Sequence, residues 1–331
     1  MRRLLLMAWV ILLCLMEASA AHAQLKRIVF IRYPIPASHF TTVLDGFKTT
    51  MSQQGFQEGR QVEYIDIITR SADTTSIPEV VAAVKQWRDR ADLIVTCGWV
   101  SMYARPLLKE SRTMQLFLPV LKSVAQTMLP SVTKQPRTNL TGLYLMYPPE
   151  KILRLCRLLL PGMTRYAYIY DSRIPADMIF KSGYQKLPTA QRYDIDLHLF
   201  DLAAGIDTVL MQLREHKIEA YGGIVGSFTL RQELASSKLP VITSFTLDID
   251  QQDLATFVQE GNIVAGLYNP FRYCGEQGAL ITADIFSGRT TIEQSSPRPA
   301  MQLAFVNLAA ARRLGLHVSL AALDAVDIVV Q

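Results

Sequence analysis

Short runs of β-branched residues alternate with stretches of helical periodicity along nearly the whole chain, and this alternation constrains the fold more than any other feature. Residues 27–31 form the first apolar run, and a loop with two prolines follows it. Apolar side chains from Phe40 to Met51 then recur at the spacing of one helix face. Strand, loop and helix in this order are typical of βαβ units, so the sequence predicts parallel sheets.

The same pattern predicts further strands. They are residues 62–68, 92–96, 115–121, 140–145, 166–170, 195–200, 220–225, 240–243 and 263–267. The strand that begins at Tyr166 is followed by a proline loop and a helical pattern, in the order found after residue 27. A chain of 331 residues also exceeds what one hydrophobic core usually supports. We therefore expect two α/β lobes of similar architecture.

The first residues have the pattern of an export signal. Arg2 and Arg3 precede an apolar run over residues 4–15, and Ala21-His22-Ala23 provides the small-x-small pattern of a signal peptidase site. We expect residues 1–23 to be a cleavable signal peptide, the mature chain to begin near Gln24, and the protein to be periplasmic.

Two alternatives remain for this segment. A membrane anchor would need about 20 apolar residues, and the run is shorter than that. A lipoprotein would carry its lipid on Cys14, but Leu12 and Leu13 precede it where such signals have small residues. Cleavage is the better interpretation of the composition.

Charge and cysteine content exclude several classes. The chain has 34 basic and 29 acidic residues, and no basic run is longer than Arg312-Arg313, so no nucleic-acid partner is expected. Three cysteines follow the signal segment, Cys97, Cys156 and Cys274, which are too few for a disulfide framework. One disulfide and one free thiol would suit an oxidising compartment. Cys156 lies on the apolar stripe of a predicted helix, so we expect it to be buried.

The sequence lacks the common catalytic and cofactor motifs. It has no P-loop, no G-x-G-x-x-G after a strand, no G-x-S-x-G and no H-E-x-x-H, and its five histidines are isolated. Two Asp-Ile-Asp stretches, Asp194/Asp196 and Asp248/Asp250, could each direct two carboxylates to one side. We interpret both as solvated loops or strand edges rather than acid–base pairs. We expect a protein that is not an enzyme and that holds no cofactor and no metal.

Ligands of open α/β sheets bind beyond the carboxyl ends of the strands, where helix N-termini present free N–H groups. This rule selects Tyr33, Ser38, His39, Trp99, Ser101 and Ser123 from the first half, Asp171, Arg173, Ser227, Phe228, Ser244 and Phe245 from the second, and Tyr268 and Asn269 where the chain returns. Aromatic and hydroxyl side chains of this kind can stack on a small ligand and fix it with a few hydrogen bonds. Packing or helix capping remains the alternative role of each.

Several segments resemble one known family. They are Gly46-Phe47, Gly55-Phe56-Gln57-Glu58-Gly59-Arg60-Gln61-Val62, Ala91-Asp92-Leu93-Ile94-Val95, Asn139-Leu140-Thr141-Gly142, Gly275-Glu276-Gln277, and a C-terminal signature over residues 306–316 with a closing helix over residues 320–329. In these the chain resembles ABC-transporter substrate-binding proteins of the kind that are receptors for tryptophan and other aromatic or hydrophobic amino acids. The resemblance implies a two-lobed type I periplasmic-binding fold, each lobe a parallel sheet flanked by helices.

The resemblance also implies an organisation and a function. Residues 24–142 with 268–296 would form one lobe, and residues 143–267 with 297–331 the other. Such a protein captures a small organic ligand between its lobes and passes it to an ABC permease. The alternative is a ligand-sensing periplasmic module that docks on the ectodomain of a membrane receptor.

Three loops depart from the family pattern. The loop over residues 33–39 is longer, residues 123–126 replace an Asp-Pro, and Tyr268-Asn269-Pro270 replaces a segment with an acidic residue. A buried ammonium group needs a paired carboxylate, so these losses argue against an α-amino acid. The expected ligand class is an amino acid or a related small solute, and the three loops favour a related solute over an α-amino acid itself.

Overall fold

The computed structural model describes residues 25–331 except 36–37, 72–73, 136 and 246–247. The expected signal peptide, residues 1–23, and the alternative lipid site at Cys14 lie outside the described residues. Within the described part of the chain, no helix combines the length and apolarity needed to cross a membrane.

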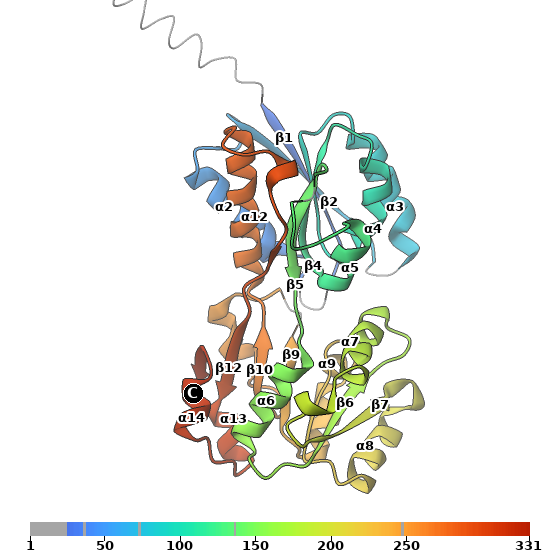
Figure 1. Cartoon of the computed structure of the whole chain (residues 1–331), viewed down its shortest axis with the longest axis vertical. Helices are drawn as coiled ribbons and strands as arrows, with labels where there is room; N and C mark the ends of the chain where they lie inside the picture. Colours follow the sequence, from blue (N-terminus) through green and yellow to red (C-terminus); the bar gives the residue numbers. More distant parts are fainter. Residues whose placement is uncertain (1–24, 36–37, 72–73, 136, 246–247) are drawn as a thin grey trace, which may run out of the picture.

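The first sheet has six parallel strands in the order β11-β5-β4-β3-β1-β2. They are β1 (Lys26–Arg32), β2 (Val62–Ile68), β3 (Leu93–Thr96), β4 (Met114–Leu121), β5 (Leu140–Leu145) and β11 (Arg298–Pro299). The helices of this part are α2 (Thr41–Gln53), α3 (Ile77–Trp87), α4 (Val100–Leu108), α5 (Lys122–Met128) and α12 (Phe271–Phe286). Helices α2 and α12 cover one face, and α3, α4 and α5 cover the other (Figure 1).

Strand β1 shows why its sequence forms a central strand. Ile28 and Phe30 pack toward α2 and α12, whereas Val29 and Ile31 pack toward α3 and α4. Successive side chains of a strand point to opposite faces, and both faces of this sheet are covered. A continuous apolar run is therefore what the position requires.

The second sheet has seven strands in the order β13-β12-β10-β9-β8-β6-β7, and β12 is antiparallel to β10. They are β6 (Arg165–Tyr170), β7 (Asp196–Asp201), β8 (Ala220–Gly222), β9 (Val241–Phe245), β10 (Ile263–Tyr268), β12 (Leu303–Asn307) and β13 (Ile328–Val330). The helices are α6 (Pro149–Leu159), α7 (Pro175–Gln185), α8 (Ile206–Glu215), α9 (Gly226–Thr229), α10 (Arg231–Leu234), α11 (Leu254–Phe257), α13 (Leu308–Arg313) and α14 (Leu320–Asp324). Short 3₁₀ turns occupy Thr74–Ser76, Thr189–Gln191, Leu202–Ala204, Ala235–Ser237, Gln251–Asp253 and Ile292–Gln294.

The part built on the first sheet is called lobe 1, and the part built on the second sheet lobe 2. The chain passes between them three times, at residues 146–148, 269–270 and 300–302 (Figure 1). The third crossing is bonded to the first, because Gln302 Nε2 donates to the Met146 carbonyl at 2.5 Å. The expected two-lobed α/β architecture is confirmed.

The C-terminus corrects one expectation. A closing helix over residues 320–329 was expected, but α14 ends at Asp324 and the chain finishes in strand β13. Its Ile-Val-Val sequence suits a strand, and β13 pairs with β12, which the strand pattern did not predict. The expected strand over residues 220–225 is also shorter, because β8 ends at Gly222.

Candidate functional site

The loops at the carboxyl ends of the strands face each other across the two lobes. Strand β5 leaves lobe 1 at its carboxyl end, and β1, β3 and β4 run parallel to it in the same sheet. Strand β10 likewise leaves lobe 2 at its carboxyl end, and β6, β8 and β9 run parallel to it. The loops after these strands therefore border the space between the lobes (Figure 1).

On the lobe 1 side these loops hold a cluster of aromatic rings. The Tyr33 ring lies 5.1 Å from that of Phe40 and 5.3 Å from that of Trp99. Trp99 contacts Tyr103 edge to face at 5.5 Å, and Phe40 stacks on Phe271 at 5.6 Å. The indole Nε1 of Trp99 is buried and has no hydrogen-bond partner among the described residues. Because a buried donor normally finds an acceptor, this N–H is a group that a ligand could satisfy.

Arg32 fixes the loop that follows β1. Its guanidinium group binds Asp66 at 2.5 and 2.6 Å and donates to the His39 carbonyl at 2.5 Å. Burial opposes the charge, but the hydrogen bond and the charge of Asp66 raise the pKa of Arg32 above its ordinary value. The His39 side chain itself is exposed. Arg32 therefore positions the backbone from which Ser38 and His39 project.

The Asp248–Asp250 segment is not the solvated loop that the sequence suggested. Asp248 is 6% exposed, and the hydroxyls of Ser38 and Thr42 in lobe 1 donate to its carboxylate. Asp250 forms an ion pair with Arg272 at 2.8 Å. The segment follows the carboxyl end of β9, and ligands of open α/β sheets bind beyond such strand ends. This position could have identified Asp248 and Asp250 as residues between the lobes. The other pair, Asp194 and Asp196, is exposed as expected.

On the lobe 2 side, Asp171 is already paired within its own loop. Its carboxylate accepts from Arg173 Nε at 2.8 Å and from Arg173 Nη2 at 2.6 Å. The hydrogen bonds from Arg173 hold the pKa of Asp171 below its ordinary value, although burial opposes this. Asp171 is therefore an ionised carboxylate with a partner of its own.

Buried Asp177, in the first turn of α7, joins two of the lobe 2 loops. It accepts backbone N–H groups of Asp171 at 3.0 Å, Val225 at 3.0 Å and Gly226 at 2.9 Å. Burial raises the pKa of Asp177, whereas these N–H groups lower it, and the net shift is upward. The carboxylate thus fixes the loop after β6 relative to the loop after β8.

Ser227 and Phe228 border a small hollow in lobe 2 of about 20 Å³, which is room for about one water molecule. Phe228 stacks on Phe257 at 5.0 Å, and the Arg231 guanidinium lies 4.5 Å from the Phe228 ring centroid. These contacts hold Phe228 within its lobe. Ser244 and Phe245 are buried in β9.

The second crossing contributes two buried polar groups without complete pairing. The Tyr268 hydroxyl has no hydrogen-bond partner within the described chain, and burial raises its pKa to about 12. Asn269 is fully buried, its Nδ2 donates to the Met301 carbonyl at 2.6 Å, and its Oδ1 is left unpaired. The two residues are 1% and 0% exposed, and the Tyr268 ring packs against Phe305 in lobe 2.

The structure thus brings Tyr33, Ser38 and Trp99 to the facing edge of lobe 1, with Tyr268 and Asn269 at the crossing. Ser123 is exposed on α5. Ser101 lies inside lobe 1, where its hydroxyl donates to the Thr96 carbonyl at 3.1 Å. That bond gives Ser101 a structural partner of its own.

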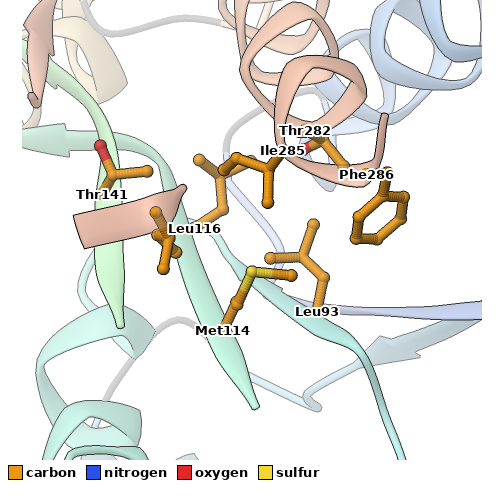
Figure 2. A pocket seen from close by; sticks show the side chains of 8 residues that line it. Leu93, Met114, Leu116, Thr141, Thr282, Ile285 and Phe286 are labelled. Atoms are coloured by element: carbon orange, nitrogen blue, oxygen red, sulfur yellow. The ribbon is translucent and has the colours of Figure 1, made fainter. Parts of the chain in front are cut away.

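Another hollow lies at the end of lobe 1 that faces away from lobe 2. Leu93, Met114 and Thr141, near the amino ends of β3, β4 and β5, line it together with side chains of α12 (Figure 2). It has no room for a water molecule. It is remote from the facing loops and is not a candidate ligand site.

Within the described ranges, no group of three or more His, Cys, Asp or Glu side chains is arranged to hold a metal ion. Cys97, Cys156 and Cys274 are buried and unpaired, so the disulfide left open by the sequence is not formed. Burial raises the pKa of each thiol, to about 12 for Cys274, which disfavours the reactive thiolate form. The expected burial of Cys156 is confirmed.

Comparison with known proteins gave no matching family model and no matching curated protein. Solved structures do match. A conserved domain protein from Vibrio cholerae is 17% identical with a TM-score of 0.71, and the match covers 92% of this chain and 99% of that one. An ABC domain in complex with L-Trp from Streptococcus pneumonia is 14% identical with a TM-score of 0.71 and the same coverage.

A ligand-free, open substrate-binding protein with adhesive properties from Clostridium difficile is 14% identical with a TM-score of 0.72. That match covers 93% of this chain and 100% of the other. Identities this low establish the fold alone. The resemblance inferred from the sequence is confirmed at that level, and the chain has the two-lobed type I fold of ABC-type substrate-binding proteins.

Proposed function

We propose that this protein is a periplasmic solute-binding protein that captures a small organic ligand between its lobes and delivers it to an ABC permease. The observation that carries the proposal is the facing of the strand-end loops across three chain crossings. Export depends on residues 1–23 acting as a signal peptide, as their composition predicts.

Capture follows from this geometry by rotation of the lobes about the crossings. A ligand held by one lobe gains contacts with the other lobe only when the lobes close, so it shifts the equilibrium toward the closed form. The closed form then differs in shape from the open form, and a permease can distinguish the two.

The side chains around the space favour a small solute with an apolar or aromatic part. The rings of Tyr33 and Trp99 can stack on such a ligand, while Trp99 Nε1 can donate to it and Asn269 Oδ1 can accept from it. The carboxylates of Asp171 and Asp248 already have protein partners, which disfavours a ligand that needs a dedicated carboxylate. One of the structural neighbours holds L-Trp, so aromatic solutes are the first candidates, and those without an ammonium group fit the paired carboxylates best.

A thermal-shift screen of amino acids, small carboxylates and nucleosides with the mature protein tests the proposal. A solute present at about 100 times its dissociation constant should stabilise the fold by about 2.7 kcal/mol. If no member of the screen raises the melting temperature, capture of such solutes is refuted. If purified protein converts a hit into product, the protein is an enzyme instead.

A further inference from the structure

Helix α2 of lobe 1 has a weak cap of its own, because the Thr41 N–H donates to Ser38 Oγ at 3.3 Å but the residue at the N-cap position makes no side-chain hydrogen bond. Phe40 occupies the N-cap position with a left-handed backbone, at φ of 57°, and provides no side-chain hydrogen bond. The first turn of α2 also contains no acidic residue. The first N–H groups of a helix lack partners within it and carry the positive end of the dipole, so this end favours an anion.

Asp248 of lobe 2 supplies that anion. The Thr42 backbone N–H points to Asp248 Oδ2 at 3.4 Å, and the hydroxyls of Ser38 and Thr42 donate to the two carboxylate oxygens. The side chain is almost completely buried by these contacts. The helix in one lobe is therefore capped by a carboxylate from the other.

Asp250, two residues further on, makes a second contact of the same kind. Its Oδ2 pairs with Nε of Arg272, in the first turn of α12, at 2.8 Å. Helices α2 and α12 form one packed unit, in which Phe40 stacks on Phe271. The two carboxylates thus bind the same helix pair at neighbouring N-terminal ends.

We propose that Asp248 and Asp250 form an interlobe clasp that holds lobe 2 on the α2–α12 pair, and that the arrangement of the lobes held in this way is the closed one. The clasp consists of protein groups alone, so part of the free energy of closure is independent of the solute. The inference rests on the proposed solute capture and deepens it, because Asp248 and Asp250 are positioning residues that set how often the binding-competent form is populated.

The distance between the lobes in the absence of any solute tests the clasp. Nitroxide labels are attached at Gln126→Cys on α5 and Met178→Cys on α7, both exposed positions. The three described native cysteines are buried and should not react with the label. Electron spin resonance then gives the distribution of interlobe distances.

Asp248→Ala with Asp250→Ala should lengthen and broaden this distribution. Asp253→Ala is the matched control, because Asp253 lies in the same segment and is exposed, and it should leave the distribution unchanged. Asp250→Ala alone leaves the cap of α2 intact and should produce a smaller change in the same direction, so the test does not depend on the stability of α2.

Equal distributions for the wild type, the double variant and Asp250→Ala would overturn the clasp. Because this measurement uses no solute, its result is separate from the test of the proposed function, which is the thermal screen of the wild type. With a solute from that screen, we expect the double variant to bind about tenfold more weakly, and unchanged affinity would count against the clasp.

Discussion

Among individual residues, Trp99 combines an aromatic face with an unpaired buried N–H at the edge of lobe 1. We predict that Trp99→Ala weakens solute binding at least tenfold, because it removes both the stacking surface and the donor. Trp87→Ala is the matched control, since Trp87 ends α3 near the amino edge of the sheet and contacts Arg27 instead. Calorimetric titration compares the two, and equal losses would show that Trp99 acts through stability alone.

Asp171 allows a prediction about pH. Its pKa is lowered in the folded state by Arg173, so its contribution to stability is present above the unfolded pKa and is lost as the pH falls through the folded value. Arg173 is 69% exposed, and the contribution should be only about 0.5–1 kcal/mol. Chemical denaturation should give a lower free energy of unfolding for Asp171→Asn than for the wild type at pH 7, and the two values should become equal in strong acid. If the difference in free energy of unfolding grew as the pH fell, the Asp171–Arg173 pair would not be its source.

At the scale of elements, Asp177 joins the loops that follow β6 and β8. Asp177→Asn leaves one acceptor oxygen for three backbone N–H groups, so we predict a loss of about 1–3 kcal/mol in the free energy of unfolding. Asp207→Asn, in the exposed first turn of α8, should change it by less than about 0.5 kcal/mol. Urea denaturation measures both, and similar values for the two variants would refute the role of Asp177.

The close packing of α2 on α12 depends on small residues. A Cβ atom at Gly275 would lie 2.0 Å from the Val43 carbonyl oxygen, so Gly275→Ala should destabilise the protein by about 1–3 kcal/mol. Gly183→Ala in α7 meets nothing closer than 3.5 Å and should be neutral or stabilise by up to about 1 kcal/mol. Chemical denaturation of both variants checks this, and a neutral Gly275→Ala would show that the helices can separate at no cost.

Most strands could be predicted from local sequence, but the last two could not. The strands of both sheets were predicted where apolar runs are bounded by turn residues, as in β1 and β6. Strand β12 was missed because it leads directly into α13 without a turn, and β13 because its three residues adjoin a helical pattern. Their strand conformation depends on pairing with β10 and with each other, which is tertiary information.

At the scale of the whole molecule, the sequence predicted the two lobes and the loops that face each other, because both follow from the order of βα units. It did not predict the contact of Asp248 with Ser38, since these residues are 210 positions apart and no local pattern joins them. It also did not show that Ser101 donates to a carbonyl inside lobe 1. Partners of polar side chains depend on the tertiary arrangement, which local patterns do not contain.

A crystal structure with the strongest solute of the thermal screen would show directly whether a small solute binds between the lobes. We predict that the solute lies against the ring of Trp99, with Asn269 Oδ1 at the crossing within hydrogen-bond distance. A solute bound on an outer face of either lobe, away from both residues, would show that the space between the lobes is not the binding site.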